Sequence, residues 1–283
     1  MNKKDNFSEN RSEMNRKTTE LLMNKYGKDI SMFDESFVNK TILQRIDITG
    51  CLDIADYGRF VAENETEAAV FTGLLQVSYS EFFRNPLTFS VLESIVLPEM
   101  VFRKRNNKSK EIRIWSAACA GGHEPYSMAM ILENLVGQND KMRYRIFGTD
   151  QDEAQINKAR LGEYCKECTG NVRQKQLEKW FVQSGNSWLV IPELKKHIKF
   201  SVFDLLSKQY SSPPESIYGD FDLVLCANVL FYYKPEVQKI IMDKMRESLA
   251  DDGLLVTGEA EREILKTGKF KEVFPQSAIF RKK

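Results

Sequence analysis

The chain has 283 residues, with 41 Lys and Arg against 40 Asp and Glu, so its formal net charge is +1. This balance argues against a dedicated nucleic-acid-binding protein, which would carry a basic excess or stripe. The chain is 42% hydrophobic and 11% aromatic. That is too much buriable surface for a disordered chain, and the length predicts about two folded domains.

The N-terminal region gives no sign of membrane targeting. Residues 1–28 are polar and mixed in charge, without the apolar segment of a signal peptide. No stretch approaches the roughly 18 consecutive apolar residues of a membrane span. The sequence therefore predicts a cytoplasmic protein without membrane insertion, in which residues 1–18 form a flexible tail.

Residues 19–88 have the periodicity of helices. Apolar side chains recur at steps of three and four, as at Phe37, Ile42 and Ile46, which is the pattern of one-sided burial. We expect a helical N-terminal domain over this range.

From about residue 111 short apolar runs alternate with helical segments. Strands are predicted over 112–115, 144–148, 198–203, 221–226 and 253–257, and helices over 124–136, 152–161 and 235–249. Strands that alternate with helices indicate a parallel sheet covered on both faces. The segment from Phe270 to Phe280 is predicted to be a terminal hairpin, so residues 89–283 form an α/β domain.

One segment breaks this alternation. Residues 162–197 are too long for an ordinary connection, and they contain a predicted helix over 176–181 and a predicted strand over 187–191. We expect an inserted subdomain at the edge of the sheet.

The five cysteines are an odd number and are scattered, unlike a disulfide framework. Cys165 and Cys168 have the CxxC spacing of redox and zinc sites, but there is no second pair and both histidines are distant in sequence. Two ordinary reduced thiols in a polar loop are the favoured interpretation.

A loop of small residues, 117–123, follows the first strand of the α/β part. Small residues let the backbone approach a ligand, and Asp150 ends the next strand with a carboxylate able to accept bonds from two ribose hydroxyls. The loop lacks both GxGxxG and the Lys-Ser/Thr ending of a triphosphate loop. This favours a nucleoside without phosphates, such as S-adenosylmethionine, over a dinucleotide or ATP.

The segment from Ser78 to Pro86 has two interpretations. It fits a helix that carries the aromatic pair Phe82 and Phe83 and is ended by Pro86. It also fits a ligand-binding segment that presents Arg84 and the Ser80 hydroxyl. The pattern alone favours the helix.

Four sequence blocks, in order and at matching spacing, resemble the chemotaxis receptor methyltransferases, the CheR family. They are Ser80–Asn85, Ile114–Ser127 (IWSAACAGGHEPYS), Phe203–Leu206 and Cys226–Tyr233 (CANVLFYY). The resemblance covers nearly the whole chain from about Leu21. It implies a Rossmann-like doubly wound sheet of the class I methyltransferase type, with a helical N-terminal domain and a small inserted β-containing subdomain.

The resemblance also implies an activity. The family transfers a methyl group from S-adenosylmethionine to glutamate side chains on the cytoplasmic helices of chemoreceptors, leaving S-adenosylhomocysteine and a methyl ester. Because a glutamate carboxylate with a pKa of about 4.3 is ionised at neutral pH, no general base and no metal are expected.

The family pattern assigns roles to residues of this chain. Arg84, with Ser78, Ser80, Ala118 and Glu124, is expected at the methionine end of the cofactor, and Asp150 at the ribose. Asp204 and Leu205 are expected to flank the adenine, and Asn228 and Val229 to line the site near the sulfonium. Tyr232 and Arg84 are expected nearest the incoming carboxylate.

Five positions depart from the family pattern: Ser78 for Asn, Ala118 for Gly, His123 for Glu, Asp204 for Asn and Ala227 for Arg. The departures at Ser78 and Ala227 leave open a cofactor-binding sensor or interaction module that has lost turnover. A methyltransferase that acts on another carboxylate acceptor is the second alternative.

Two surfaces are candidates for partner binding. The family's N-terminal domain presents a basic helix to the receptor, and the matching helix here carries Lys40 and Arg45, for which docking and an ordinary solvated face remain open. The inserted subdomain resembles one with which some members bind a receptor's C-terminal peptide by strand pairing.

Overall fold

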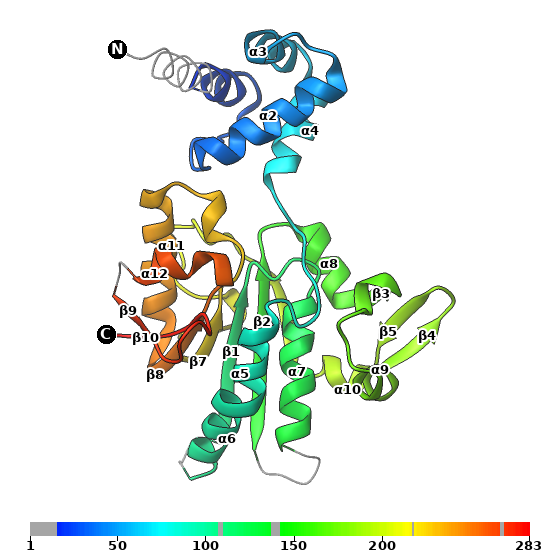
Figure 1. Cartoon of the computed structure of the whole chain (residues 1–283), viewed down its shortest axis with the longest axis vertical. Coiled ribbons are helices and arrows are strands. Elements are labelled where there is room, and N and C mark those ends of the chain that lie inside the picture. Colours follow the sequence, from blue (N-terminus) through cyan, green and yellow to red (C-terminus); the bar gives the residue numbers. More distant parts are fainter. Residues whose placement is uncertain (1–15, 107–109, 137–141, 217, 267–268) are drawn as a thin grey trace. The chain divides into compact units, whose positions relative to one another are not determined.

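The computed structural model describes residues 16–106, 110–136, 142–216, 218–266 and 269–283 (Figure 1). Most of the expected tail, residues 1–15, lies outside the described residues, and residues 16–26 are helical. The chain divides into two compact units. One consists of Met1–Val77 with Phe231–Gln238, and the other of Ser78–Leu230 with Lys239–Lys283.

The first unit is helical, as its periodicity predicts. After residues 16–26 its helices are α2 (Glu35–Thr49), α3 (Ile54–Glu63) and α4 (Glu65–Leu75). Asp34 begins α2 by accepting the N–H groups of Ser36 and Phe37, and Gly50, with a φ of +75°, ends it. The core of the unit is apolar and includes Leu22, Ile42, Val61, Phe71 and Leu75.

Arg45 in α2 is part of the interior of this unit. Its guanidinium donates to both carboxylate oxygens of Glu67 at 2.8 and 2.7 Å, and Tyr57 donates to the same carboxylate at 2.8 Å. The Arg45 and Glu67 side chains are only 13% and 8% exposed. The interpretation of Arg45 as a receptor-facing or solvated cation is therefore wrong, because its charge is neutralised inside the helix packing. Lys40 is exposed.

The second unit alternates helices and strands. Up to residue 161 it contains α5 (Pro86–Val91), the π-helix η1 (Leu92–Val96), α6 (Leu97–Arg105), β1 (Glu111–Ala117), α7 (His123–Val136), β2 (Arg143–Asp150) and α8 (Glu153–Leu161). After the insertion come β6 (Ile198–Val202), η3 (Pro214–Ser216), β7 (Phe221–Leu225), η4 (Leu230–Tyr232), α11 (Pro235–Ser248), β8 (Leu249–Val256), η5 (Glu259–Glu261), α12 (Arg262–Lys266), β9 (Phe270–Glu272) and β10 (Ile279–Lys282). Within this stretch, residues 231–238, which include most of η4 and the start of α11, are assigned to the first unit.

The described strands form a seven-stranded sheet in the order β6-β2-β1-β7-β8-β10-β9. From β6 to β8 all neighbours are parallel, and β10 runs antiparallel to both β8 and β9. The predicted Rossmann-like sheet and its terminal hairpin are confirmed. Because the chain moves outward from β1 to β2 and later returns to place β7 on the other side of β1, the topological switch point lies between β1 and β7.

The centre of this sheet is buried on both faces, which explains its continuous apolar runs. The side chains from Ile114 to Ala117 in β1 and from Leu223 to Leu225 in β7 are buried. Helices α6 and α7 contact each other and lie against β1 and β2, respectively. The sheet thus forms a rigid base from which its carboxyl-end loops project.

The insertion has its own small sheet in the order β3-β5-β4 (Figure 1). Its elements are β3 (Glu163–Cys165), η2 (Glu167–Thr169), α9 (Gln174–Trp180), β4 (Phe181–Ser184), β5 (Ser187–Val190) and α10 (Pro192–Lys195). The sequence predicted α9 and β5, whose Trp188, Leu189 and Val190 form an apolar run, but missed β3 and β4, in which the apolar runs are shorter.

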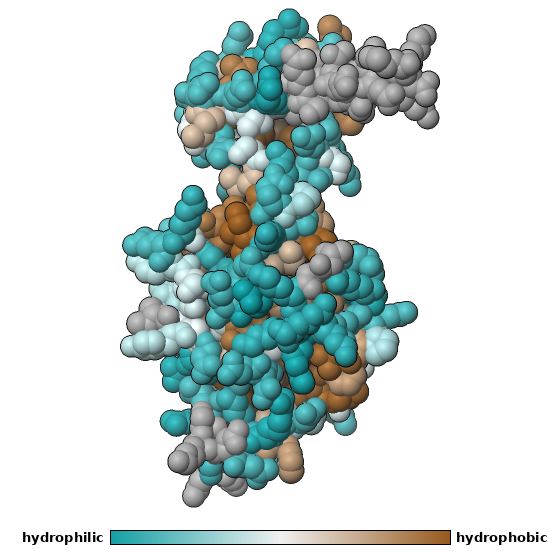
Figure 2. Space-filling model, turned by 90° about the vertical axis from the view of Figure 1, so that its left-hand side faces the viewer, coloured by the Kyte–Doolittle hydropathy of each residue, from teal (hydrophilic) through white to brown (hydrophobic). Residues whose placement is uncertain are grey.

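The molecular surface is largely hydrophilic on the face shown in Figure 2. In the described part of the chain, no helix combines the length and apolar character needed to cross a bilayer. Among the same residues, no three His, Cys, Asp or Glu side chains are grouped so as to hold a metal ion.

Candidate functional site

The carboxyl ends of the central strands β2, β1 and β7 lie side by side at the same end of the sheet. These strands are adjacent and parallel, so the loops that follow them are brought together at the switch point. The loops contain Ala118–Gly122 after β1, Asp150 at the end of β2, and Cys226–Val229 after β7. This end of the sheet is where open α/β sheets bind ligands.

The loop after β1 has an unusual backbone that requires small side chains. Ala118, Ala120 and Gly122 have φ values of +53°, +46° and +86°. A Cβ on Gly122 would lie 2.8 Å from the Cβ of Ala159 in α8, so this position accepts only glycine without a shift of the packing. The loop is therefore a tight cradle with little side-chain bulk.

Asp150 is fixed from the protein side. Its carboxylate accepts the N–H of Ala120 at 2.9 Å and that of Asp152 at 3.0 Å, and the residue is 9% exposed. Burial raises the pKa of Asp150, against the lowering effect of these N–H groups. A carboxylate has about four lone-pair sites, so acceptor capacity remains for a pair of hydroxyl groups.

Glu124 stands in the first turn of α7 and faces the end of β1. The Ser116 hydroxyl donates to its carboxylate at 2.7 Å. Burial raises the pKa of Glu124 to about 7, opposed by the Ser116 hydrogen bond and by the charge of Arg84, while Glu261 raises it further. Glu124, Arg84 and Glu261 are thus electrostatically coupled.

The segment that carries Arg84 is not a helix, so the helical interpretation of Ser78–Pro86 is wrong. Phe83 and Asn85 have φ values of +51° and +61°, and helix α5 begins only at Pro86. The Phe83 N–H donates to the Ser127 hydroxyl of α7 at 3.0 Å, which anchors the segment to the sheet domain.

Arg84 itself is half-buried and folds back on its own segment. Its guanidinium donates to the Tyr79 carbonyl at 3.0 Å and lies 5.3 Å from the centre of the Tyr79 ring. Ser78 accepts a 3.2 Å hydrogen bond from the Gln155 amide of α8, and Ser80 is half-buried in the same segment.

The turn after β6 lies beside Asp150. The Phe203 N–H donates to the Asp150 carbonyl at 2.9 Å. Leu205 is buried, whereas Asp204 is exposed and accepts the Leu206 N–H at 2.8 Å. An apolar side chain and a carboxylate therefore stand next to the β2 end of the site.

The loop after β7 is organised by Glu261, which sequence reasoning missed. The Glu261 side chain is fully buried and accepts the backbone N–H groups of Asn228, Val229 and Leu230 at 2.8, 2.6 and 2.6 Å. It also accepts the Thr257 hydroxyl and the Gly258 N–H at 2.8 Å each. One carboxylate thus fixes two loops that follow neighbouring strands.

The hydrogen bonds to Glu261 hold the backbone of Asn228 in its left-handed conformation. Its φ is +62°, and its side-chain oxygen lies 3.4 Å from the amide nitrogen of Asn85, which links the β7 loop to the Arg84 segment. A Cβ on Gly258 would lie 2.5 Å from the Asn228 amide nitrogen. In the sequence, the signal for this arrangement was Gly258, which follows β8 closely and stands three positions before the acidic residue Glu261.

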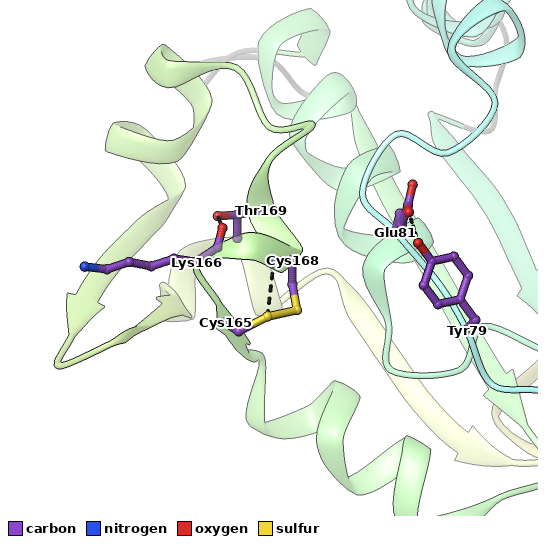
Figure 3. Close-up of a disulfide and its surroundings, with 6 residues drawn as sticks. All are labelled: Tyr79, Glu81, Cys165, Lys166, Cys168 and Thr169. Carbon is purple, nitrogen blue, oxygen red and sulfur yellow. Dashed lines mark hydrogen bonds between the residues drawn. A yellow bond between two sulfur atoms is a disulfide. The ribbon is translucent and has the colours of Figure 1, made fainter.

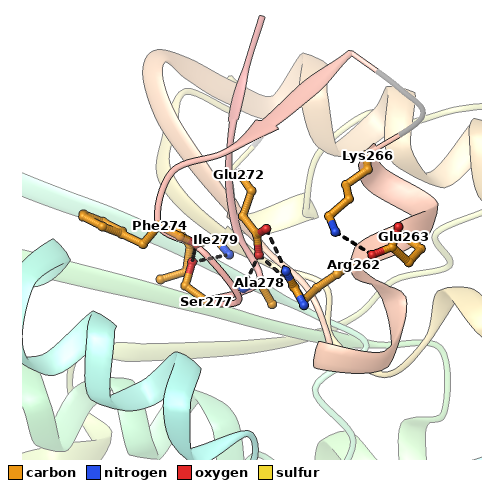
Figure 4. A network of polar contacts seen from close by, with 8 residues as sticks. All are labelled: Arg262, Glu263, Lys266, Glu272, Phe274, Ser277, Ala278 and Ile279. Atoms are coloured by element: carbon orange, nitrogen blue, oxygen red, sulfur yellow. Dashed lines mark hydrogen bonds and ion pairs between the residues drawn. The ribbon is translucent and has the colours of Figure 1, made fainter.

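Next to Glu261, the C-terminal hairpin anchors α12 (Figure 4). Arg262 donates to both carboxylate oxygens of Glu272 in β9 at 2.7 and 2.9 Å, and Glu272 also accepts the Ala278 N–H at 3.1 Å. This bidentate pair is mostly buried, so it holds the backbone that positions Glu261.

His123 and Tyr232 contact aromatic side chains. His123 packs against the rings of Phe82 and Tyr164, at 4.9 and 4.6 Å, and burial lowers its pKa to about 4. Tyr232 belongs to the helical unit, where its ring lies 4.8 Å from that of Phe37. The role of Tyr232 beside Arg84 stays a prediction.

His197 and the CxxC pair have partners that the sequence did not indicate. His197 is half-buried, lies 3.2 Å from Glu133 and packs on the Tyr144 ring. Cys165 and Cys168, expected as separate thiols, form a disulfide. The fold brings Glu133 close to His197, and a turn that the sequence pattern did not predict brings the two cysteines together.

The residues at the switch point fit S-adenosylmethionine. The cofactor has a sulfonium, an amino-acid tail and a ribose. Glu124 and Asp150 offer carboxylates for a cationic ammonium group and for hydroxyls, and Arg84 offers a cation for a carboxylate. The small-residue cradle leaves room for close approach of the ligand to the backbone.

The chain is similar to known methyltransferases. Residues 78–279 match the family described as CheR methyltransferase, SAM binding domain. A chemotaxis protein methyltransferase of Listeria monocytogenes is 30% identical over 244 residues, 86% of this chain and 88% of the relative. One from Escherichia coli is 29% identical over 252 residues, 87% and 83% of the two chains. The protein is a member of the CheR methyltransferase family and an S-adenosylmethionine-dependent methyltransferase.

Proposed function

We propose that this protein methylates glutamate side chains on the cytoplasmic helices of chemoreceptors and forms glutamyl methyl esters. The observation that carries the proposal is the cluster of Arg84, Glu124 and Asp150 at the switch point of a chain that is similar to chemotaxis protein methyltransferases. When bound, S-adenosylmethionine supplies an electrophilic methyl group on a good leaving group.

In this proposal the protein's residues bind and orient S-adenosylmethionine. Arg84 pairs with the carboxylate of the cofactor's amino-acid tail, and ionised Glu124 accepts its ammonium group. Asp150 accepts the ribose hydroxyls, and Asp204 with Leu205 borders the adenine. Ser78, Ser80 and Ala118 line the tail end of the site, where the β1 loop turns tightly through the left-handed residue Ala118.

The acceptor needs no proton transfer, because a glutamate carboxylate is already ionised at neutral pH. The protein must align the carboxylate oxygen with the methyl carbon and sulfur, and such positioning supplies up to about 7–11 kcal/mol of the barrier. Asn228 and Val229, fixed by Glu261, border the reacting centre. Tyr232 orients the carboxylate by a hydrogen bond weak enough to leave it nucleophilic.

The activity is tested with radiolabelled cofactor and receptor-bearing membranes. We expect label in the receptor that base treatment releases as volatile methanol, the signature of a methyl ester. Binding of S-adenosylhomocysteine without label transfer supports the cofactor-sensing module that Ala227 leaves open. Base-volatile label in a different protein or small acid supports another carboxylate acceptor.

A receptor peptide at the inserted subdomain is the second partner in this proposal. Strands β3 and β4 are the outer strands of its sheet, and Val182 in β4 is 58% exposed. An outer strand offers unpaired backbone groups to an extended peptide. Titration with peptides from receptor C-termini tests this, with a scrambled peptide as the control and Val182→Asp expected to weaken binding.

A further inference from the structure

The disulfide between Cys165 and Cys168 has no part in the proposed methyl transfer. It closes the turn between β3 and η2 (Figure 3). Both cysteines are exposed. Among the free cysteines, Cys119 and Cys226 are buried, and burial raises the pKa of both thiols. The exposed pair is therefore the one that a dissolved thiol can reach.

The two sulfurs of the pair have different surroundings. The backbone N–H of Cys168 donates to the sulfur of Cys165 at 3.2 Å. A hydrogen bond of this kind favours the thiolate over the thiol, and the more stable thiolate is the better leaving group in exchange. An attacking thiolate thus reacts at the Cys168 sulfur and releases the Cys165 thiolate.

The residues that directly follow the disulfide-closed turn contact the segment that carries Arg84 and the helix after it. Within the turn, the Thr169 hydroxyl donates to the Lys166 carbonyl at 2.8 Å. The Asn171 amide then donates to the Glu81 carboxylate at 3.3 Å. Two residues further on, Arg173 pairs with both carboxylate oxygens of Glu93, at 2.7 and 2.8 Å.

From Glu81 the contacts continue to Arg84. The Tyr79 hydroxyl donates to the Glu81 carboxylate (Figure 3), and the Tyr79 carbonyl and ring both contact the Arg84 guanidinium. The disulfide-closed turn is therefore joined to the proposed cofactor-tail residue through the short backbone segment 168–171 and the contacts of Asn171, Glu81 and Tyr79.

We propose that Cys165 and Cys168 form a reversible thiol–disulfide exchange site whose oxidised form holds the Arg84 segment in place. In the reducing direction, one thiolate of a dithiol forms a mixed disulfide with Cys168 while Cys165 leaves. The second thiolate then releases Cys168, so that two protein thiols and one cyclic disulfide result. Reduction frees the turn and weakens the Asn171–Glu81 contact.

The coupling to Arg84 rests on the proposed cofactor site, so the experiment has two separate readouts. The protein is equilibrated with mixtures of reduced and oxidised dithiothreitol, the free thiols are alkylated, and their masses are measured. In the same mixtures calorimetry measures the Kd of S-adenosylhomocysteine. Besides any label on Cys51, which is free in both redox forms, we expect reduction to add two alkylated sites, at 165 and 168, in folded protein. We also expect a Kd about two- to tenfold higher after reduction, the worth of one exposed hydrogen bond.

Three variants separate the exchange from a general effect of reductant. The double variant Cys165→Ser with Cys168→Ser should show, at every mixture, the higher Kd of the reduced native chain. Asn171→Ala should show the same higher Kd even while its disulfide is intact. Cys51→Ser, whose thiol lies in the helical unit, should respond as the native chain does.

The outcomes distinguish the two proposals. A pair that stays oxidised until the protein unfolds overturns the exchange site. Equal Kd values in both redox forms overturn the coupling and leave the methyltransferase proposal intact. If neither form binds S-adenosylhomocysteine, the cofactor site fails and the coupling fails with it, while the alkylation still decides the exchange.

Discussion

The carboxylate of Glu261 lies 2.8 Å from the backbone nitrogen of Asn228, 33 positions earlier in the chain, whose φ is +62°. The same carboxylate accepts the next two N–H groups, so it acts as an internal anion for the loop after β7. A fully buried carboxylate is stable only with such partners, and here the partners are the backbone of the proposed reacting centre.

We therefore expect Glu261→Gln to lower both stability and cofactor affinity. The amide would turn an N–H group toward backbone donors, and each lost hydrogen bond to a buried charge is worth about 1.5–3 kcal/mol. Thermal unfolding and the Kd of S-adenosylhomocysteine measure the effect. Glu259→Gln, an exposed change in the same short helix, is the control and should leave both unchanged.

Cofactor binding should strengthen as the pH rises through 7. Burial raises the pKa of Glu124 to about 7, so at pH 6 most of the carboxyl groups are neutral and cannot pair with an ammonium group. For a single titrating group the Kd of S-adenosylhomocysteine then falls about tenfold between pH 6 and pH 8. The Glu124→Gln variant should bind weakly with a flat profile, and a slope that survives in this variant would contradict the assignment.

The stability of the protein without cofactor should change with pH in the opposite direction. Because the folded pKa of Glu124 lies above the ordinary value of 4.5, the group contributes stability below that value and loses it as the pH rises through about 7. Cofactor at saturating concentration should remove this loss. Unfolding midpoints with and without S-adenosylhomocysteine, taken across the same pH range, test it.

Asp150→Asn should weaken cofactor binding by about tenfold or more while the sheet remains folded. An asparagine keeps one acceptor for the Ala120 N–H but replaces the ionised acceptor that the ribose hydroxyls require. Calorimetry and circular dichroism check both parts. Asp252→Asn, at an exposed position, is the matched control.

Arg84→Ala and Tyr232→Phe should separate binding from turnover. Loss of the guanidinium removes a charged partner of the cofactor tail and should raise the Kd about 10- to 100-fold. Loss of one hydroxyl at Tyr232 should chiefly lower kcat in the labelling assay. Equal and negligible effects from both variants would refute these roles.

In the helical unit, Arg45→Met should cost about 3 kcal/mol of unfolding free energy, because it leaves the buried Glu67 carboxylate without its cation. Although burial raises the pKa of Glu67, the hydrogen bonds from Arg45 and Tyr57 and the charge of Arg45 together hold it below its usual value. The pair thus stabilises the folded state above the ordinary pKa and loses this effect as the pH falls. Arg59→Met, which removes an exposed ion pair with Asp56, should cost less than about 1 kcal/mol in the same denaturation experiment.

Local signals in the sequence were strong where periodicity is long. The helix from His123 is confirmed because several consecutive turns carry its pattern, and the strands around Trp115 and Leu223 because short apolar runs there stand between helical segments. The segment from Ser78 to Pro86 misled because an aromatic pair before a proline fits a helix end equally well. Two left-handed residues, Phe83 and Asn85, decide its path, and no periodicity encodes them.

By itself the sequence determined the α/β class, the terminal hairpin, the resemblance to the CheR methyltransferases and the residue types expected around Asp150 and Arg84. Only the tertiary structure decided which buried charges pair: Arg45 with Glu67, and Glu261 with the backbone of Asn228. The reason is physical. Burial of apolar side chains leaves a periodic trace in the chain, whereas a buried carboxylate chooses its partners among groups that only folding brings within hydrogen-bond distance.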